Sequence, residues 1–368
     1  MLARRYDGLH GHGRLVDFVI HNEVNTNTWF DIGCGAGVPC NVEAWTQTYA
    51  ASYNSAYDQI TAEQPKAKVL FSLDNQFGSE LDRPTAADPV VSGQTFITRL
   101  ATLVAPREWR VAYHPYPPNL LKPEFGADDW PHVGYGNIGA LAGWLRATFP
   151  NVPSATEIQL TESGINSIGA SNPGAQADAL CRSFRNVLGT PGIESYIYHR
   201  MRDNVGETVA GLGLGLFTEA GAPKPAWSVW ALANRNDLAP PVLSCGFEDL
   251  PYTRLSRSFH PARGHWASSR FPPSGFTVEA SWRLLHDAAP DTLPLYECLV
   301  GAHNLITQSP TCEGLRPLGP VGYAYTAPGP GRLALMRCYS RANGDHFVSA
   351  DPGCEGQQVE QLLGFATP

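Results

Sequence analysis

The stretch Val19-Ile20-His21-Asn22-Glu23-Val24-Asn25 begins with apolar residues and changes to a polar run that contains a glutamate. The stretch Ile158-Gln159-Leu160-Thr161-Glu162-Ser163-Gly164 has a similar order of residue types. Each stretch indicates a short buried strand that ends near a carboxylate and continues into a loop. In folds built on parallel strands, ligands bind at the carboxyl ends of the strands. We therefore expect Glu23 and Glu162 to face one site in an α/β fold.

Strand and helix patterns alternate over residues 15–236. Strands are expected at Leu15–Ile20, Val69–Leu73, Trp109–Tyr113, Glu157–Thr161 and Ile193–Tyr198. Helices are expected at Val42–Ile60, Phe96–Val104, Ile138–Phe149, Ala175–Leu188 and Ala226–Ala233, where apolar residues recur at three- and four-residue steps. Such alternation is typical of a parallel sheet with crossover helices.

The last third of the chain has a different pattern. Residues 238–251 are rich in proline and predict a linker between a first domain at 1–237 and a second at 252–368. The second domain contains three copies of about 40 residues, all short strand segments and turns. His265, His303 and His346 mark the copies. A three-fold all-β domain such as a β-trefoil is expected.

Composition excludes several classes of protein. Hydrophobic residues make up 43% and charged residues 16%, so the chain is not a disordered tail. The net charge is −8 and the longest basic run is Arg4-Arg5, which argues against a nucleic-acid partner. No apolar run reaches about 18 residues, so no membrane span is expected. The first 20 residues contain no apolar segment typical of a signal peptide.

Six of the eight cysteines form three closely spaced pairs, Cys34/Cys40, Cys298/Cys312 and Cys338/Cys354. None has C-x-x-C spacing, and histidines at zinc-ligand spacing are absent, so a metal site is not expected. Disulfides in an oxidising compartment are the better interpretation, and the protein is expected to be secreted or extracellular. Cys181 and Cys245 either pair with each other or stay free.

Two carboxyl groups from different strands of one sheet are what glycoside hydrolysis requires. One carboxyl group protonates the leaving oxygen, and the other stays ionised to attack the sugar or to activate water. The alternative is that each glutamate caps a helix or forms a structural salt bridge. The occurrence of both glutamates at strand ends favours the catalytic interpretation.

These residues resemble a known family. Asn22-Glu23 and Thr161-Glu162-Ser163-Gly164 are similar to the fourth- and seventh-strand motifs of clan A glycoside hydrolases, which are retaining (β/α)8 barrels. Tyr113-His114-Pro115-Tyr116 falls where the sixth strand of that clan supplies a His and a Tyr. Together with Ser72-Leu73-Asp74 and His199-Arg200-Met201-Arg202-Asp203, they resemble a bacterial branch of the clan formerly described as a domain of unknown function.

The resemblance implies a role for each matching residue. Glu23 would be the general acid/base, Glu162 the nucleophile, and Asn22 a hydrogen-bond partner of the sugar 2-hydroxyl. Tyr116 would hold Glu162. The remaining residues that the resemblance places in the sugar site are Asp74, Asn75, His114, Tyr198 and Asp203. The carboxyl groups would lie about 5–5.5 Å apart, the substrate would be an oligo- or polysaccharide, and no cofactor or metal would be needed.

The chain departs from the family in one respect. The Asn-Glu motif belongs to the fourth strand, yet it begins at Asn22. A full barrel needs about 250 residues, so the fold expected is a partial barrel of strands four to eight. Such a chain would expose two sheet edges, and we expect poor stability and weak activity, with a signal peptide lying upstream.

Two other functions are considered. Asp31-Ile32-Gly33-Cys34-Gly35-Ala36-Gly37 resembles the glycine-rich loop of S-adenosylmethionine-dependent methyltransferases, a loop that needs a strand directly before the Asp. The chain could also be a non-catalytic carbohydrate-binding or cell-surface protein. Its three-copy domain resembles a small bacterial domain appended to secreted hydrolases, in which Trp266, Tyr323 and Phe347 either bind sugar or fill the core.

Overall fold

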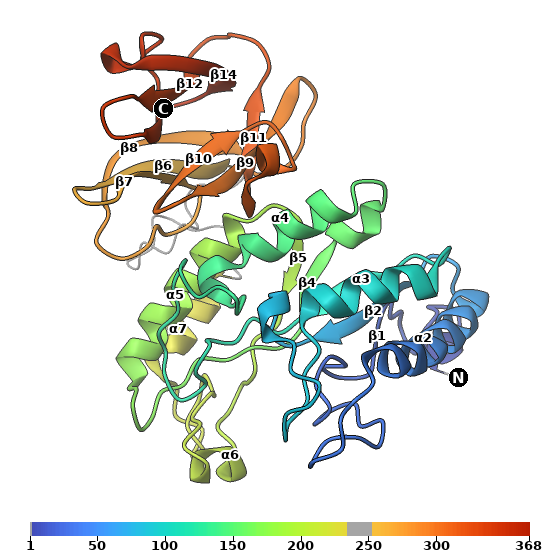
Figure 1. Ribbon diagram of the computed structural model, residues 1–368. Coiled ribbons are helices and arrows are strands. Elements are labelled where there is room, and N and C mark those ends of the chain that lie inside the picture. Colours follow the sequence, from blue (N-terminus) through green and yellow to red (C-terminus); the bar gives the residue numbers. More distant parts are fainter. Residues whose placement is uncertain (1, 234–251) are drawn as a thin grey trace.

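The computed structural model describes residues 2–233 and 252–368. Residues 2–233 form an α/β region, and residues 252–368 form an antiparallel region, drawn in orange and red in Figure 1. The predicted linker at 238–251 lies outside the described residues. No helix among the described residues is long and apolar enough to cross a membrane.

The α/β region contains one sheet of five parallel strands in chain order. The strands are β1 (Asp17–Ile20), β2 (Lys68–Leu73), β3 (Arg110–Tyr113), β4 (Ile158–Leu160) and β5 (Ile193–Tyr196), so all five predicted strands are confirmed. Near the amino ends of the strands, Gln159 Nε2 lies 3.1 Å from Asp17 Oδ1, and Lys68 Nζ lies 2.8 Å from Glu194 Oε2. These contacts join strands that are not neighbours, so the sheet is strongly curved and resembles part of a barrel.

Helices cover the outside of this curved sheet (Figure 1). The longer ones are α2 (Val42–Glu63), α3 (Gly93–Val104), α4 (Gly139–Thr148), α5 (Pro173–Leu188) and α7 (Pro225–Ala233), and shorter ones are α1 (Leu2–Arg5), α6 (Val205–Val209), η1 (Ser79–Leu81), η2 (Tyr135–Asn137) and η3 (Pro153–Thr156). Asn41 caps α2 by accepting a hydrogen bond from the Ala44 amide. Trp45, Tyr49 and Tyr53 recur every four residues on α2, and all three are fully buried in the core.

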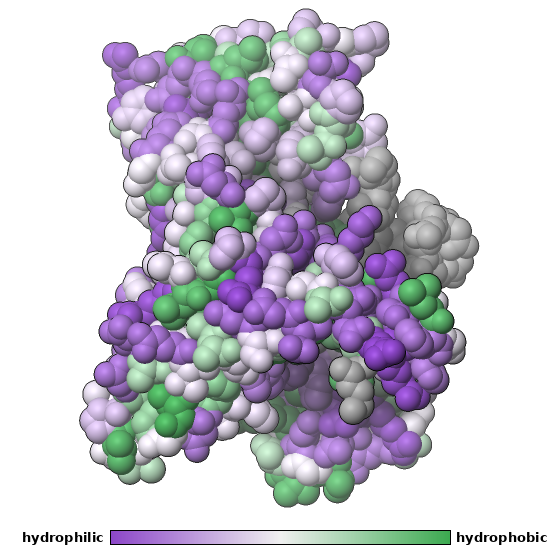
Figure 2. All heavy atoms as spheres, turned by 90° about the vertical axis from the view of Figure 1, so that its right-hand side faces the viewer, coloured by the Kyte–Doolittle hydropathy of each residue, from purple (hydrophilic) through white to green (hydrophobic). Residues whose placement is uncertain are grey.

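Both edges of the parallel sheet are open. Among the described strands, β1 pairs only with β2, and β5 pairs only with β4. Apolar side chains beside these edges reach solvent, since Val19 is 41% exposed and Ile197 is 54% exposed. On the face drawn in Figure 2, hydrophilic residues predominate and hydrophobic residues are scattered among them. The two unpaired edges expected from the sequence are therefore present.

The antiparallel region repeats one arrangement of long, short and long strands three times. The strands are β6 (Tyr252–His260), β7 (Gly264–Ser268), β8 (Thr277–Leu285), β9 (Thr292–Val300), β10 (His303–Thr307), β11 (Arg316–Tyr325), β12 (Leu333–Ser340), β13 (Asp345–Ser349) and β14 (Gln358–Ala366), with short helices η5 (Cys312–Gly314) and η6 (Cys354–Gly356). All nine strands belong to one antiparallel sheet. Alternate apolar residues of the long strands pack into a core of their own.

The structure corrects the alignment of the three copies by one residue. The short strands begin at Gly264, His303 and Asp345, so these three positions are equivalent. His265 lies opposite Phe259 and His346 opposite Tyr339, whereas the residue opposite Leu299 is Asn304. His303 is therefore equivalent to Asp345, not to the other two histidines. The two later copies agree with this alignment, because the second cysteine lies nine positions after the start of the short strand in each, Cys312 after His303 and Cys354 after Asp345.

Three disulfides join cysteines of the described residues, and they are the three pairs expected from the spacing. Cys34–Cys40 has a Cα separation of 5.1 Å, and Cys298–Cys312 and Cys338–Cys354 each have 5.6 Å. Each of these bonds closes a short loop, and their number is consistent with an oxidising compartment. Pairing of Cys181 with Cys245 was one of two expectations for these residues, and Cys245 lies outside the described residues.

The two regions pack closely against each other. Helix α4 lies under β11 (Figure 1), and a Cβ added at Gly139 would lie 2.4 Å from the backbone oxygen of Leu318. Helix and strand can approach so closely only because glycine lacks a side chain. Arg270 reaches from the antiparallel region to the Gly189 carbonyl at the end of α5. The interface is thus formed by backbone contact and a buried guanidinium.

Candidate active site

A cavity of about 830 Å³ lies at the carboxyl ends of the parallel strands. This volume is within the range of small-molecule sites. Its lining residues are Asn22, Glu23, Trp29, Asp74, Asn75, Gln76, Arg83, Tyr116, Pro117, Pro118, Leu120, His132, Glu162, His199, Glu207, Leu212 and Leu214. Both predicted catalytic glutamates are among them, so their strands bring them to one place.

Glu23 occupies a constrained backbone position directly after β1. Its φ is 38° and that of His21 is 62°, both in the left-handed region that non-glycine residues rarely adopt. The Glu23 amide donates a 3.1 Å hydrogen bond to Ser72 Oγ, and the Val24 amide donates to the Ser72 carbonyl. These bonds to β2 hold the turn that directs the Glu23 carboxylate into the cavity. Strained residues of this kind are concentrated at functional sites.

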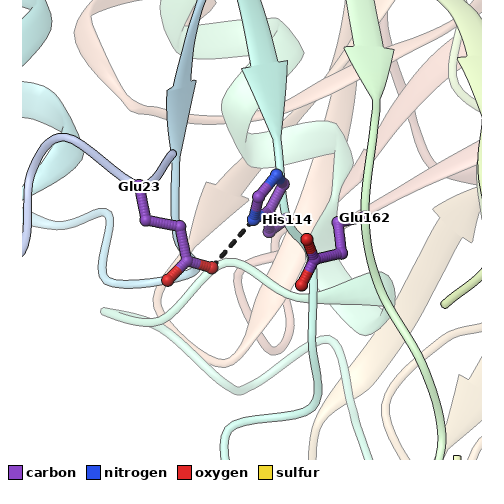
Figure 3. A group of neighbouring side chains, drawn as sticks. All are labelled: Glu23, His114 and Glu162. Atoms are coloured by element: carbon purple, nitrogen blue, oxygen red, sulfur yellow. Dashed lines mark hydrogen bonds and ion pairs between the residues drawn. The ribbon is translucent and has the colours of Figure 1, made fainter. Parts of the chain in front are cut away.

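His114 follows β3 and is 2% exposed. Its Nδ1 lies 2.8 Å from Glu23 Oε1, and its Nε2 lies 3.2 Å from Ser72 Oγ. A proton on Nδ1 satisfies both bonds, because Nδ1 then donates to Glu23 while the Ser72 hydroxyl donates to Nε2. Figure 3 shows the contact with Glu23. His114 therefore supports the carboxylate expected to be the acid/base.

Glu162 follows β4 and is paired with Tyr116. The Tyr116 hydroxyl donates a 2.9 Å hydrogen bond to Glu162 Oε1. Burial, followed by the charge of Glu162, raises the pKa of Tyr116 far above its ordinary value. The phenol therefore remains a neutral donor over the whole physiological pH range. This contact corresponds to the role expected for Tyr116.

The two carboxylates and His114 converge (Figure 3). One oxygen of Glu23, one oxygen of Glu162 and one nitrogen of His114 all lie within 4.8 Å of one another. Carboxyl groups of inverting glycosidases are separated by about 6.5–9.5 Å, and those of retaining enzymes by about 5–5.5 Å. The same three groups form a set that could hold a divalent cation, although both His114 nitrogens already have hydrogen-bond partners.

Three other predicted residues also line the cavity. Asp74 accepts hydrogen bonds from the side chains of Asn25 and Gln76, each at 2.6 Å. Asn75 donates a 3.0 Å bond to the carbonyl of Tyr116, and so steadies the segment that carries the Glu162 partner. Asn22 lies beside Glu23 on the cavity wall. The structure therefore places every predicted site residue that precedes β5 at the cavity except His114, which contacts Glu23 but is buried and does not line the cavity.

Two predicted sugar-site residues lie elsewhere. Tyr198 is 8% exposed, and its hydroxyl accepts 3.2 Å hydrogen bonds from the Ile165 amide and the Gln176 side chain. Asp203 forms a 2.7 Å ion pair with Lys224, and both side chains are nearly inaccessible to solvent. Neither residue lines the cavity. The expectation that they would line the sugar site is corrected, because each side chain turns toward internal partners that strand position alone does not reveal.

Other cavity residues were not expected from the sequence. His199 follows β5 and lies 3.3 Å from Glu207 Oε1, which also accepts a 2.9 Å bond from Arg200. A polar residue directly after a strand was the available signal for His199. Trp29 and Arg83 lie in irregular segments without periodicity, so no sequence signal placed them at the cavity.

The glycine-rich loop has no strand before it. Residues 24–31 contain turns and irregular backbone, and Asp31 is not at a strand end. The loop is closed by the Cys34–Cys40 disulfide and by pairing of Gly35 with Val38. The strand that a methyltransferase loop needs directly before its Asp is thus lacking, which argues against that alternative.

Comparison with known proteins identifies a family. Residues 1–239 match the model of a family described as a family of unknown function (DUF5722), and the chain belongs to this family. No curated protein matches the chain.

Solved structures of low similarity are also found. A family 39 glycoside hydrolase from Bacteroides cellulosilyticus WH2 has 15% identity and a TM-score of 0.41, over 74% of this chain and 53% of that one. A Bacteroides uniformis β-glucuronidase has 12% identity and a TM-score of 0.42, over 92% of this chain and 39% of that one. A Bifidobacterium dentium β-glucuronidase has 16% identity and a TM-score of 0.33, over 62% of this chain and 32% of that one. The chain spans about half or less of these proteins.

Proposed function

We propose that this protein is a retaining glycoside hydrolase in which Glu162 is the nucleophile and Glu23 the general acid/base. The observation that carries the proposal is the approach of two strand-end carboxylates to within 4.8 Å in a cavity large enough for sugar residues. An approach this short between one oxygen of each carboxylate favours the separation of about 5–5.5 Å of retaining enzymes over the wider separation that leaves room for an attacking water molecule.

The proposed reaction has two steps. Glu162 attacks the anomeric carbon while Glu23 gives its proton to the glycosidic oxygen, which leaves as an alcohol. Glu23 then removes a proton from water, and the resulting hydroxide displaces Glu162 from the anomeric carbon. The sugar is released with its original configuration, and both carboxyl groups return to their starting states. The Tyr116 hydrogen bond fixes one Glu162 oxygen, leaving the other to attack.

Binding roles are assigned from position around the two carboxylates. Asn22 lies beside Glu23 and would hydrogen-bond the sugar 2-hydroxyl, a contact that strengthens as positive charge develops in the transition state. Asp74 and Asn75 present polar groups from the end of β2. His114 would orient Glu23 from behind, since it is buried and does not line the cavity.

The proposal includes the finer architecture. The five strand–helix units would correspond to strands four to eight of a (β/α)8 barrel over residues 1–237. Residues 252–368 would be a β-trefoil-like accessory domain, joined through a linker at 238–251. The protein would act outside the bacterial cell on an oligo- or polysaccharide. The open sheet edges at β1 and β5 are expected to reduce the activity of this chain.

A non-catalytic carbohydrate-binding protein is the second candidate. The open parallel sheet favours it, because a cavity whose walls are incomplete can bind a glycan without organising a transition state. The two candidates differ in one measurable property, which is turnover.

The test is a panel of chromogenic glycosides, with the configuration of the released sugar followed by NMR. We expect hydrolysis with retention, and loss of kcat/KM by about 10³-fold or more in Glu162→Gln, because the amide is a poor nucleophile. Glu63→Gln, a neutral change at an exposed residue at the end of α2, is the matched control. Inversion, or full activity of Glu162→Gln, would contradict the proposal, and loss of activity in EDTA would indicate a metal at the three converging groups.

A further inference from the structure

Arg83 is the only Arg or Lys that lines the cavity among the residues described at 2–233 and 252–368. The four carboxylates that line the cavity each accept a hydrogen bond from a neighbouring side chain. Glu23 is paired with His114, Glu162 with Tyr116, Glu207 with Arg200, and Asp74 with two side-chain amides. No carboxylate in this described part of the chain forms an ion pair with Arg83. Its guanidinium is therefore the one full positive charge at the cavity that is not already neutralised.

The Arg83 guanidinium is held in place by a chain of hydrogen bonds that begins in the core. Asn25 is fully buried and donates to Asp74. Asp74 accepts from Gln76 Nε2, and Arg83 Nη2 donates to the carbonyl oxygen of the same Gln76 side chain. The Arg83 backbone also pairs in both directions with Val90, which is 2% exposed. The position of the Arg83 guanidinium is thus fixed through hydrogen bonds that lead to the buried residues Asn25 and Val90.

Gln76 separates the positive charge from the nearest negative one. Its amide nitrogen faces Asp74 and its amide oxygen faces Arg83. A direct Asp74–Arg83 ion pair would have neutralised both charges. With the Gln76 amide between them, the guanidinium keeps its charge and has N–H groups that can still donate to a ligand. Because Arg83 is exposed toward the cavity mouth, those donors are available to a ligand.

We propose that the cavity binds a glycan that carries an anionic group, a carboxylate or a sulfate ester, and that Arg83 pairs with this group. The inference rests on the proposed function, since it names the substrate class of the same site. Guanidinium presents two parallel N–H donors that match the paired oxygens of either anion. Trp29 is 60% exposed and lines the same cavity, so its ring offers a flat apolar face to a sugar ring.

The experiment compares matched chromogenic glycosides that differ at one substituent: neutral galactoside, galacturonide and 6-sulfogalactoside. We expect kcat/KM to be about 10- to 100-fold higher for at least one anionic probe than for the neutral one, as a charge-assisted bond implies. The ratio should fall as salt is added, because the Arg83 site is exposed and screened.

Two variants test the role of Arg83. In Arg83→Gln the anionic-to-neutral ratio should fall to about one, whereas Arg99→Gln, the same change at an exposed residue of α3 outside the cavity, should keep it. Gln76→Glu should lower the ratio with Arg83 still present, because the new carboxylate would pair with the guanidinium. Thermal melting checks that each variant is folded. A ratio near one in the unmodified chain, or a ratio unchanged in Arg83→Gln, overturns the inference.

Calorimetry separates this inference from the proposed function. Galacturonate, sulfated galactose and neutral galactose oligosaccharides are titrated into the unmodified chain and into Arg83→Gln. Arg83-dependent binding of an anionic oligosaccharide without cleavage of any probe would uphold the anionic ligand while the hydrolase proposal fails. Cleavage without preference for an anionic probe would uphold the hydrolase proposal while the anionic ligand fails. If the anionic probes are not bound and not cleaved, the inference is overturned.

Discussion

Glu297 in the antiparallel region and Glu162 at the cavity are both carboxylates on or beside strands, yet their surroundings differ. Glu297 is 2% exposed, and its two oxygens accept bonds from Arg270 at 2.6 Å, Ser268 at 2.7 Å and Asn304 at 2.7 Å. Glu162 accepts one hydrogen bond, from Tyr116, and faces the cavity.

The difference shows how a carboxylate can be assigned to structure or to chemistry. Arg270 bonds Glu297 and also donates to the carbonyls of Gly189 and Pro320, so the pair joins the antiparallel region to the α/β region. A buried charge pair with all its hydrogen bonds made has nothing left to offer a ligand. A carboxylate with one partner and an open side has acceptor capacity for a substrate.

Of the expected differences between the two regions, the largest is the loss of stability at alkaline pH, which should be greater in the α/β region. Burial is the main cause of raised pKa values for seven tyrosines of the α/β region, Tyr49, Tyr53, Tyr113, Tyr116, Tyr135, Tyr196 and Tyr198. In the described antiparallel region, burial raises the pKa of Tyr296. The folded state then holds protons that the unfolded state loses above about pH 10, so stability falls as pH rises, by up to about 1.4 kcal/mol per tyrosine per pH unit.

The measurement is circular dichroism together with tyrosinate absorbance between pH 9 and 12. Helical signal and buried tyrosine ionisation should change together, because the phenols can ionise only when the α/β region opens. Gradual ionisation near pH 10 with the helical signal intact would show that these phenols are accessible, and would remove this difference between the regions.

A Glu→Gln change should reduce mainly stability at Glu297 and mainly activity at Glu23. Glu297→Gln leaves Arg270 buried without a counter-charge and should lower the free energy of unfolding by about 3–5 kcal/mol. Glu23→Gln should reduce kcat/KM by about 10²- to 10⁴-fold and change the free energy of unfolding far less. Urea unfolding and glycoside hydrolysis are measured on both variants. Equal loss of stability in the two would show that Glu23 is as structural as Glu297.

Mild acid should have a smaller effect, which arises from two histidines of the antiparallel region. Burial lowers the pKa of His303 and of His346, and their rings are 3.2 Å apart, between Nε2 and Nδ1. His265 and Arg337 oppose their protonation, while Asp345, Glu313 and Glu360 favour it. Because the folded pKa values are below 6.5, stability is lost as pH falls through 6.5, by at most about 1.4 kcal/mol per histidine per pH unit.

Urea midpoints at pH 7.5 and pH 5.5 measure this loss. Asp345 does not contribute in this window: burial alone would raise its pKa, but the hydrogen bonds and charge of His265, together with the charge of His303, lower it below its ordinary value. His346→Gln should flatten the dependence, with His260→Gln, a histidine outside this contact, as the control. Equal urea midpoints at the two pH values in the unmodified chain would show that the histidine pair does not make stability depend on pH.

The sequence was sufficient for the five parallel strands, for the five longer helices beside them, and for the two glutamates that follow β1 and β4. Strand β1 and Glu23 are a few residues apart, so an apolar run followed by an acid locates the carboxylate once the strands are parallel. The disulfides were equally local, since each closes a loop of 6 to 16 residues. Periodicity also identified α2, whose aromatic residues recur at helical spacing.

Side-chain partners distant along the chain could not be read from the same pattern. Tyr198 and Asp203 follow β5 as Glu162 follows β4, yet they turn to Gln176 and Lys224. Arg83 reaches the cavity because a loop returns to Gln76, and hydrogen bonds then fix its direction. Such contacts depend on how loops close in space, and loops lack the repeating geometry that makes strands and helices predictable.

The amino-acid order therefore established five parallel strands, three repeated β units, three disulfides and two strand-end glutamates, because each depends on neighbours close along the chain. The folded structure established which oxygens meet which donors, that His114 hydrogen-bonds Glu23, and that the Arg83 guanidinium, which forms no ion pair with the described carboxylates, lines the same cavity as Glu23. Those facts depend on the curvature of the sheet and on the return of its loops. Both are set by packing between residues far apart in sequence, which no local pattern contains.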